Sequence, residues 1–345
     1  MAKEVKIGSI AIGGENRIAI QSMLNFPSSD VEGNVIQAIQ LEQAGCDINR
    51  VSVPDFEAVK LISAVKNKTS IPLVADIHFN YRLAIKSVEA GADKIRFNPG
   101  NIGNDNKARM VVDCCRAHGV PIRIGVNSGS LEKELLRKHS GITSKALFES
   151  AVRNIRLIEA NGYDKIVVSL KSSDVQVMVK AYRMLAEKYD YPLHLGVTEA
   201  GTKKSGTVKS AIGIGSLLLD GIGATIRVSL TEDPIEEVSA ARDILKALGL
   251  TEAVEIISCP TCGRTDIDII TIAKDIEKRT SHIRKKIKVA VMGCVVNGPG
   301  EASQADVGIA GGKDGAVLFK KGKKIRRLKS GFADALIKEI EEMTL

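Results

Sequence analysis

Three cysteines in the last quarter of the chain have the spacing of a metal site. Cys259 and Cys262 form a Cys-x-x-Cys pair in the stretch CPTCGR (259–264), and Cys294 lies in GCVVNGPGE (293–301). Thiolates at such spacing hold zinc or an iron–sulfur cluster. An apolar run that precedes each stretch is typical of a strand, so two loops would bring the three thiolates together.

The neighbouring residues favour an iron–sulfur cluster over zinc. Structural zinc requires four nitrogen or sulfur ligands, and the histidine between the two cysteine loops, His282, lies in a basic helical run. A cubane cluster accepts an oxygen ligand or an open iron, and Glu301 lies in the same turn as Cys294. Zinc, a redox dithiol and purely structural cysteines remain as alternatives.

The bulk composition restricts the class of partner. With 345 residues the chain can form one large domain and one small one, and its net charge of +8 suits an anionic partner. Aromatic residues make up 3% and tryptophan is absent, so the chain has few groups that stack on bases, and no nucleic-acid partner is expected. The basic tract Lys320–Lys329 is expected to form a solvated hairpin.

The sequence predicts a cytoplasmic protein with no membrane partner. It contains no apolar run of about eighteen residues, and its first residues do not resemble a signal peptide. Six cysteines are too few for a disulfide scaffold. Three of them lie in helical apolar patterns and are expected to be packing residues: Cys46, Cys114 and Cys115.

Short apolar runs alternate with amphipathic segments along the first 250 residues. After a hairpin expected around Gly13 and Gly14, the predicted strands are Ile18–Met23, Ile48–Val53, Pro72–Ile77, Lys94–Asn98, Pro121–Asn127, Lys165–Lys171, Leu193–Glu199 and Ala224–Leu230. The predicted helices between them include Val35–Ala44, Phe56–Lys66, Tyr81–Ala90, Lys107–Ala117, Thr143–Asn161 and Val175–Lys188, and several end in Ala-Gly or Asn-Gly.

Eight such repeats predict an α/β fold, a TIM (β/α)8 barrel, over residues 1–250. An open doubly wound sheet is the alternative, but it would rarely need eight evenly spaced repeats. Residues 251–345 read as a small α+β domain that carries the cysteine loops and ends in a helix, Phe332–Met343.

In a barrel of this kind, polar residues at the carboxyl ends of the strands would meet in one basin. Because side chains alternate along a strand, Arg96 and Asn98 share a face, as do Arg123 and Asn127. Burying several cations together requires an anion, and arginine matches phosphate or diphosphate. The basin residues are Arg50, Asp76, His78, Arg96, Asn98, Arg123, Asn127, Lys171, Glu199 and Arg227, with Glu199 and Asp76 as acid–base candidates.

The order of elements also predicts a dimer. A last helix of about fifteen residues would carry the chain about 22 Å away from the basin. The linker that follows, of about five residues, spans at most about 17 Å. If cluster and basin cooperate, a head-to-tail homodimer in which each cysteine domain covers the partner's barrel is the simplest arrangement.

Several stretches together resemble the 4-hydroxy-3-methylbut-2-enyl diphosphate synthase family of the non-mevalonate isoprenoid pathway, in its bacterial two-domain form. They are NRVSVP (49–54), LVADIHF (73–79), RFNPGNIG (96–103), PIRIGVN (121–127), LGVTEAG (195–201) and both cysteine stretches. The resemblance implies reductive ring opening and dehydroxylation of 2-C-methyl-D-erythritol 2,4-cyclodiphosphate to (E)-4-hydroxy-3-methylbut-2-enyl diphosphate. Two electrons would come from flavodoxin or ferredoxin through a [4Fe–4S] cluster.

The same resemblance implies roles for individual residues. Cys259, Cys262, Cys294 and Glu301 would bind the cluster, and a carboxylate ligand, being weaker than thiolate, could yield to substrate. Glu199 would be the proton donor or alkoxide partner, supported by Asp76 and His78. The diphosphate would be held by Arg50, Arg96, Arg123, Asn127 and Lys171, with Arg227 and Arg264 as weaker candidates, Arg264 reaching the substrate only from the partner chain.

Two other classes of function compete with this interpretation. A zinc-stabilised aldolase or epimerase acting on a sugar phosphate would share the basin but need no electrons. The second is a non-catalytic RNA-binding protein, but this chain has few of the aromatic residues that such proteins stack on bases.

Overall fold

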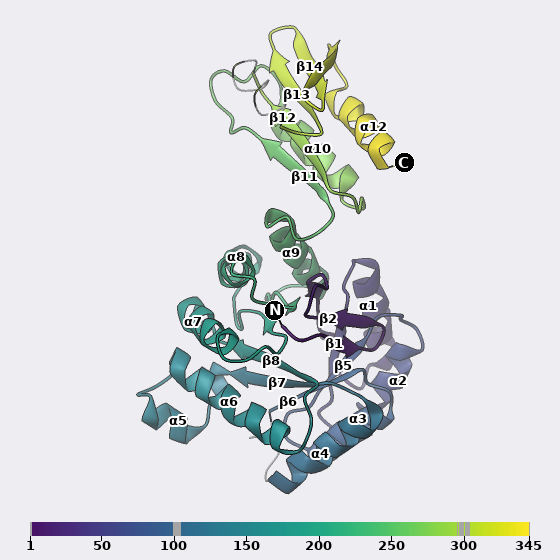
Figure 1. Ribbon diagram of the computed structural model, residues 1–345. Coiled ribbons are helices and arrows are strands. Elements are labelled where there is room, and N and C mark those ends of the chain that lie inside the picture. Colours follow the sequence, from purple (N-terminus) through teal and green to yellow (C-terminus); the bar gives the residue numbers. More distant parts are fainter. Residues whose placement is uncertain (1, 99–104, 295, 297–299, 301–303, 345) are drawn as a thin grey trace. The chain divides into compact units, whose positions relative to one another are not determined.

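The computed structural model describes residues 2–98, 105–294, 296, 300 and 304–344 (Figure 1). The chain divides into two compact units, Met1–Leu248 and Gly249–Leu345. No helix of the described residues is long and apolar enough to cross a membrane.

The larger unit is built on parallel strands that alternate with helices. Its strands lie in two sheets, of order β4-β5-β6-β7-β8 and β3-β10-β9. Their bounds are β3 Ala19–Ile20, β4 Asn49–Ser52, β5 Leu73–Asp76, β6 Lys94–Phe97, β7 Ile122–Asn127, β8 Ile166–Lys171, β9 His194–Leu195 and β10 Thr225–Ile226. Every pairing among these strands is parallel.

The strand order returns to its starting point. One isolated parallel bridge joins Gln21, directly after β3, to Ile48, directly before β4. A second joins Val168 of β8 to Leu193, directly before β9. Because β10 also pairs with β3, the ring is continuous, and the predicted (β/α)8 barrel is confirmed.

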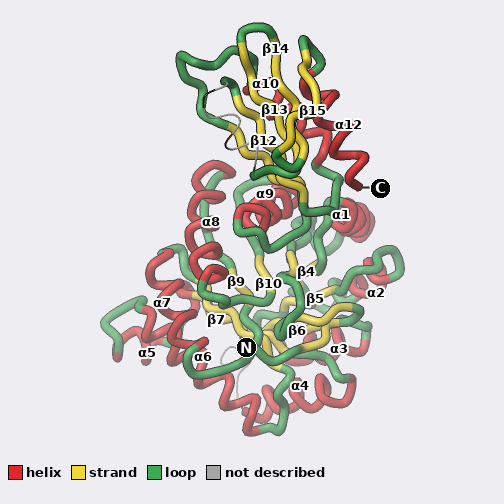
Figure 2. The backbone as a smooth tube through the Cα atoms, turned by 45° about the horizontal axis from the view of Figure 1, so that its top comes forward, coloured by secondary structure: helices red, strands yellow, loops and turns green. Residues whose placement is uncertain are grey.

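Helices connect the strands and surround them (Figure 2). Gly45, Gly91 and Gly162 follow three of the helices with φ of +88°, +96° and +70°, so the predicted glycine stops are confirmed. The helices are α1 Val31–Gln43, α2 Lys60–Lys66, α3 Tyr81–Glu89, α4 Asp105–His118, α5 Lys133–Lys138, α6 Ser144–Ala160, α7 Val175–Ala186, α8 Lys203–Leu219 and α9 Pro234–Ala247, with a short 3-10 turn η2 at Ser128–Ser130.

Several predicted boundaries were wrong for local reasons. Helix α1 begins four residues earlier than expected because the Asp30 carboxylate caps it at the Gly33 N–H, at 2.8 Å. Strand β9 ends at Leu195. The next residue, Gly196, packs against the carbonyl of Arg227, where a Cβ would lie only 2.5 Å from the oxygen. A side chain at 196 would therefore not fit.

The N-terminal hairpin closes one end of the barrel. Strands β1 Val5–Ile7 and β2 Ile10–Ile12 pair antiparallel, and their turn lies at Gly8, with φ of +53°, and not at Gly13–Gly14 as predicted. Val5, Ile7 and Ile12 pack on Ala19, Ile48, Val74, Val167 and Ala224. The amino ends of the strands are thus sealed by an apolar cluster.

In the described residues, the smaller unit contains a five-stranded sheet and the two helices α10 and α12. The order is β11-β12-β13-β14-β15, with the first three strands parallel and the last two joined antiparallel. The elements are β11 Val254–Ser258, α10 Ile269–Thr280, β12 Ile287–Met292, β13 Val307–Gly312, β14 Gly315–Lys320, β15 Lys323–Leu328 and α12 Phe332–Thr344. Apolar residues of α10 and α12 pack on one face of the sheet. The basic tract forms the predicted exposed hairpin, β14–β15.

Histidine 194 should make the barrel less stable as the pH falls. It is fully buried, its Nδ1 lies 2.8 Å from Thr225 Oγ1, and burial together with the charges of Arg123 and Lys171 holds its pKa well below the ordinary value. Below about pH 6.5 the unfolded chain binds a proton here that the folded chain does not, so stability falls by up to about 1.4 kcal/mol per pH unit.

Urea unfolding at about pH 7 and about pH 5.5 checks this expectation through the change in unfolding free energy. His194→Gln should show a smaller change between the two pH values, whereas His118→Gln, at an exposed position, should keep the wild-type change. An identical pH dependence in wild type and His194→Gln would contradict the assignment.

Candidate functional site

Four cations lie buried on strands of the five-stranded parallel sheet. Arg50, Arg96, Arg123 and Lys171 come from β4, β6, β7 and β8, and each is at most 8% exposed. The register places Arg96 directly beside Asp76 on one side and Arg123 on the other. Since paired residues of adjacent strands point to the same face, these side chains enter one basin, as predicted.

Asp76 is the carboxylate that holds two of these cations. It is fully buried, accepts a hydrogen bond from Arg50 Nη2, and accepts another from Arg96 Nη1 at 2.9 Å. Burial alone would raise the pKa of Asp76, but the charges of Arg50 and Arg96 outweigh burial and hold the pKa well below its ordinary value. The carboxylate therefore stays ionised and fixes both guanidinium groups.

Strand β7 gives Arg96 its remaining contacts. Arg96 Nη2 donates to the carbonyl of Gly125 at 3.1 Å. With its amide oriented so that both atoms are hydrogen-bonded, Asn127 accepts from the same nitrogen at 3.1 Å. A methyl group at position 125 would overlap Arg96 Nε, so the guanidinium occupies the space that a missing side chain leaves.

The positive charges of Arg123 and Lys171 are less well compensated by neighbouring groups than those of Arg50 and Arg96. The Nε and Nη1 atoms of Arg123 are buried and have no hydrogen-bond partner among the described residues. Burial and the neighbouring arginines lower the pKa of Arg123, and burial and Arg227 lower that of Lys171, in both cases well below the ordinary value. A bound anion would supply the missing partners for both side chains.

Three buried residues of this region were not predicted. Lys94 begins β6 and shares the face of Arg96, and its buried Nζ has no partner among the described residues. His194 lies nearby on β9. Glu237 of α9 accepts from Arg227 Nε and Nη2 at 3.2 and 3.3 Å. Inward alternation along the strands could have identified Lys94 and His194, whereas no pattern in the sequence marks Glu237 as a partner.

The remaining predicted basin residues lie at the rim. His78 is half exposed, with Nε2 3.6 Å from Asp76 Oδ2. Asn98, directly after β6, is buried. Glu199 is exposed in the loop after β9 and not in a strand as predicted, and its φ of +51° is a left-handed conformation that a side chain rarely adopts. Residues 99–104 lie outside the described part of the chain.

The three predicted metal-ligating cysteines line one cavity of the smaller unit. This cavity has a volume of about 110 Å³ and is bounded by Cys259, Pro260, Cys262, Arg264, Thr265, Met292, Gly293 and Cys294. The Gly293 N–H donates to Cys259 Sγ at 3.3 Å. Hydrogen bonds from the backbone and side chain of Arg264, and from Thr265, lower the pKa of Cys262, so this thiol ionises more readily.

The donor set of this cavity fits an iron–sulfur cluster. Three thiols from two loops face one space, and a backbone N–H already points at one of the sulfurs. Within the described ranges no three His, Cys, Asp or Glu side chains are close enough together to hold a single metal ion. Glu301, the predicted fourth ligand, lies outside the described residues.

The other cysteines pack in the barrel. Cys46 and Cys115 are buried, and burial raises the pKa of Cys46 to about 12. Cys114 is partly buried against the same core. All six cysteines are free thiols. The prediction that Cys46 and Cys115 are buried packing residues is therefore confirmed.

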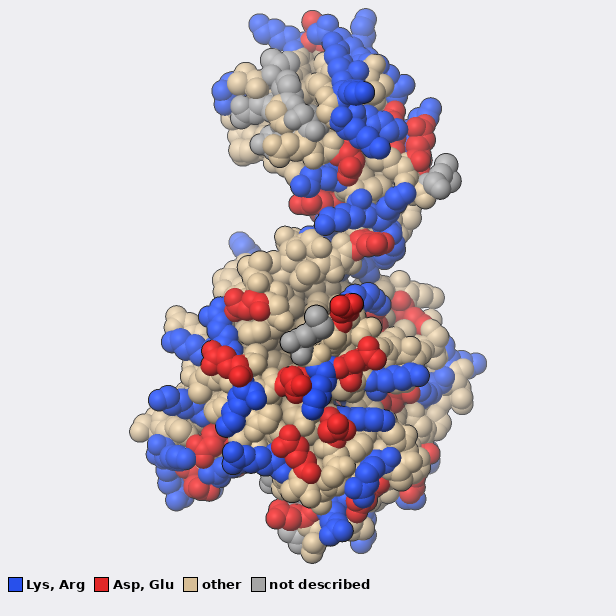
Figure 3. All heavy atoms as spheres, in the orientation of Figure 1, with Lys and Arg blue, Asp and Glu red and all other residues tan. Residues whose placement is uncertain are grey.

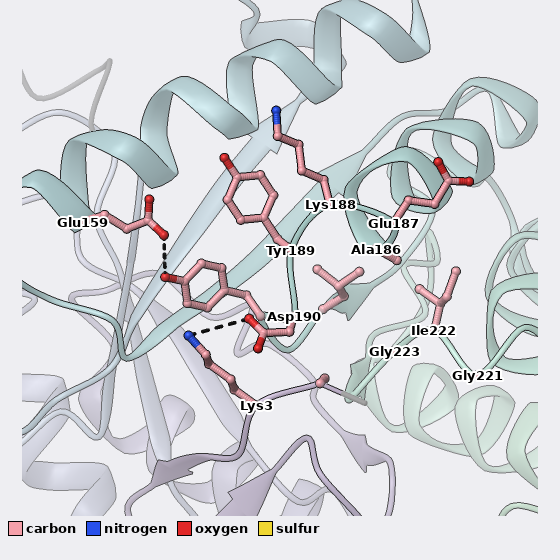
Figure 4. Close-up of a pocket in the computed structure, with 13 residues that line it drawn as sticks. Lys3, Glu159, Ala186, Glu187, Lys188, Tyr189, Asp190, Gly221, Ile222 and Gly223 are labelled. Carbon is pink, nitrogen blue, oxygen red and sulfur yellow. Dashed lines mark hydrogen bonds and ion pairs between the residues drawn. The ribbon is translucent and has the colours of Figure 1, made fainter.

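A further cavity lies at the opposite end of the barrel from the buried cations (Figure 4). It measures about 460 Å³ and is lined by residues that precede β9 and β10, including Tyr191, Leu193 and Gly223. Tyr191 donates to Glu159 at 2.7 Å, and Lys3 lies 3.6 Å from Asp190. Barrel enzymes carry their chemistry at the carboxyl ends of the strands, so we assign no catalytic role to this cavity.

Comparison with known proteins places both units in one family. Residues 2–242 match the GcpE TIM-barrel domain, and residues 255–342 match the GcpE protein C-terminal domain. The chain is 59% identical over 345 residues to the 4-hydroxy-3-methylbut-2-en-1-yl diphosphate synthase (flavodoxin) of Caldanaerobacter subterraneus subsp. tengcongensis, covering 99% of this chain and 97% of that protein. It is 55% identical to the protein of the same name from Clostridium perfringens, covering 98% of each.

Among solved structures, dihydropteroate synthase from Stenotrophomonas maltophilia superposes with a TM-score of 0.54. It is 15% identical and covers 72% of this chain and 97% of its own. A likeness at that identity shows the barrel fold alone.

Replacing Gly125 with alanine should weaken anion binding at the basin. The new methyl group would displace the Arg96 guanidinium from its position in the basin, and losing one hydrogen bond from this charged group to the anion would cost about 1.5–3 kcal/mol, or roughly tenfold or more in affinity. Calorimetric titration with inorganic diphosphate measures the loss.

Gly129→Ala is the matched control, because a Cβ there would meet nothing within 4 Å. It should bind diphosphate as the wild type does. Equal affinities for wild type and Gly125→Ala would show that Arg96 does not contact the anion.

Proposed function

This chain belongs to the GcpE family, and we propose that its two units together convert 2-C-methyl-D-erythritol 2,4-cyclodiphosphate to (E)-4-hydroxy-3-methylbut-2-enyl diphosphate. The reaction opens the cyclic diphosphate and removes one oxygen as water, consuming two electrons and two protons. The observation that carries the proposal is the buried, undercompensated charge of Arg123 and Lys171 in a barrel whose relatives are named as synthases of a diphosphate.

The basin matches a substrate with two phosphoryl groups. Two carboxylates of the described residues already pair with cations in the basin: Asp76 with Arg50 and Arg96, and Glu237 with Arg227. More positive than negative charge therefore lies in the basin. A diphosphate offers several oxygens, which suits the forked guanidinium of Arg123 beside the ammonium of Lys171. A bound anion would also favour the protonated form of Lys171.

Residues at the rim would act on the reacting carbon atoms. We assign the proton donor role to Glu199, whose exposed carboxylate lies in the loop after β9. Asp76 and His78 would support the substrate, Asp76 by holding Arg50 and Arg96 in place. The strained backbone at Glu199 supports a functional role, since such conformations cost about 1–3 kcal/mol and persist where a site requires them.

A [4Fe–4S] cluster would be held by Cys259, Cys262, Cys294 and Glu301. When bound, it supplies single electrons for cleavage of the substrate's carbon–oxygen bond. A carboxylate ligand is held more weakly than a thiolate, so Glu301 would leave its place open to substrate. Arg264, which lines the cysteine cavity, would stabilise the thiolate of Cys262.

The electron donor would be flavodoxin, as in the names of the relatives, and a ferredoxin would serve the same chemistry. Both would be encountered in the cytoplasm, where a reducing environment keeps six free cysteines reduced.

A head-to-tail homodimer would bring basin and cysteine cavity together. Helix α9 follows the last strand and spans fourteen residues, or about 21 Å, away from the carboxyl ends of the strands. Six residues, 248–253, then lead to β11 and span at most about 21 Å. A partner chain would supply the cysteine unit to each basin without stretching this linker.

The function is tested on protein purified without oxygen and reconstituted with iron and sulfide. We expect a brown protein that converts the cyclic diphosphate when dithionite supplies the electrons. A colourless, iron-free preparation with full activity would refute the proposal. A zinc-containing protein that catalyses aldol cleavage or epimerisation of a sugar phosphate without a reductant would establish the rival enzyme class.

Glu301→Ala should separate cluster assembly from turnover. Three cysteines remain, so most iron and sulfide should be retained, while product formation should be lost because the replaceable ligand is missing. Iron and sulfide analysis and the dithionite assay measure the two effects. Glu277→Ala, an exposed carboxylate on α10, is the control and should keep both. A fully active Glu301→Ala variant would remove Glu301 from the ligand set.

Mixing two inactive variants should restore activity if the active site is shared. Lys171→Met disables the basin, and Cys262→Ser disables the cluster. In a mixed dimer, one of the two active sites combines the intact basin of one chain with the intact cysteine unit of the other. Random reassociation should therefore recover about a quarter of the wild-type activity. The measurement is dithionite-driven turnover after the two variants are dissociated and mixed. A mixture as inactive as its components would exclude sharing between chains.

A further inference from the structure

The edge of the smaller sheet carries a dense strip of positive charge. Seven of the ten residues from 320 to 329 are Lys or Arg and none is acidic. Strand β15 is an edge strand, and its residues Lys323–Arg327 are all exposed. We call Lys321, Lys323, Lys324, Arg326, Arg327 and Lys329 the β15 strip. Figure 3 shows lysine and arginine side chains gathered on this unit.

Most of the β15 strip has no compensating charge. Arg327 lies 3.4 Å from Asp314, a pair in which both side chains are more than half exposed. No other member of the strip has an ion-pair partner among the described residues. On the visible face of the larger unit, by contrast, acidic and basic side chains are interspersed (Figure 3). The strip is therefore a local excess of positive charge.

The sheet register places one end of the strip beside the cysteine cavity. Arg327 pairs with Val317, Val317 with Ala310, and Ala310 with Met292, which directly precedes Gly293 and Cys294. Paired residues share a face of the sheet, so Arg327 and Met292 lie on the same face. Three strand spacings separate them, or about 14 Å.

Other residues of the cavity lie at the same end. Cys259 directly follows β11, whose last residue Ser258 pairs with Val291. Lys313 is exposed in the turn between β13 and β14, next to the pairing of Gly312 with Gly315. Arg327 and Lys329, at one end of the strip, are thus at the cysteine end of the sheet, and Lys313 adds a further positive charge there.

We propose that this end of the β15 strip is the docking surface for the electron donor, an acidic flavodoxin whose flavin would face the cysteine cavity. The inference rests on the proposed function, which requires electrons to reach the cysteine cavity. Flavodoxins are acidic proteins, so opposite charges would steer the encounter and set its orientation. Lysines on a sheet edge also prevent strand pairing between molecules, but that role would not require charge at the cysteine end.

A double charge reversal tests the docking surface. Arg327→Glu with Lys329→Glu changes the strip, and Lys180→Glu with Lys209→Glu, at exposed positions of α7 and α8, makes the same change in net charge elsewhere. The reconstituted full-length proteins are titrated with oxidised flavodoxin, and binding is followed by calorimetry at low salt. Turnover is then measured with reduced flavodoxin and, separately, with dithionite.

The strip variant should bind flavodoxin at least about tenfold more weakly and lose as much in flavodoxin-driven kcat/KM, while its dithionite-driven rate stays at the wild-type value. The control pair should stay within about twofold of wild type in all three measurements.

Equal weakening by the control pair would overturn the proposal, because net charge alone would then explain binding. An unchanged affinity of the strip variant for flavodoxin would also overturn the proposal. This holds even if the variant aggregates through its sheet edge. If the proposed function is wrong, the wild type will not convert the cyclic diphosphate with dithionite. The flavodoxin affinities of the wild type and the strip variant can still be compared in that case.

Discussion

The positive charge buried at the carboxyl end of the barrel is the constraint on which the rest of this structure depends. Arginine and lysine side chains are costly to remove from water, and a single fully buried carboxylate, Asp76, holds two of them. Arg123 and Lys171 stay undercompensated in the described structure. Such a basin is stable only as part of a rigid frame, and it gains most from a ligand with several negative oxygens.

Two features of the barrel provide that frame: the N-terminal hairpin and two glycines beside the cations. At the amino ends of the strands, the hairpin β1–β2 seals the interior with an apolar cluster. At the carboxyl ends, Gly125 and Gly196 leave space for the side chains of Arg96 and Lys171. The absence of a side chain at these two positions is therefore as necessary to the basin as the cations themselves.

The smaller unit solves a different problem, which is to hold thiols from distant parts of the chain around one cavity. Strands β11 and β12 are adjacent and parallel, so the loops that follow them leave the sheet at the same end. The helices α10 and α12 cover one face of the sheet and fix both strands. Of the edge strand β15, Leu328 packs against the core, whereas the exposed residues Lys323–Arg327 carry four positive charges.

The sequence by itself determined the repeating pattern, the glycine helix stops, the cysteine loops and most of the cations, because periodicity and spacing are local properties of the chain. Alternation along the predicted strands put Arg96 and Asn98 on one face, and likewise Arg123 and Asn127, whereas Arg50 was expected as a polar residue at the end of its strand. Tertiary structure alone decided how these charges are compensated: Glu237 takes Arg227, and Asp76 joins two strands. It also placed Lys94 and His194 in the interior, moved the hairpin turn to Gly8 and ended β9 before Glu199. All of these outcomes depend on contacts between residues that are far apart in the sequence. Local patterns in the sequence do not show which residues will be in contact.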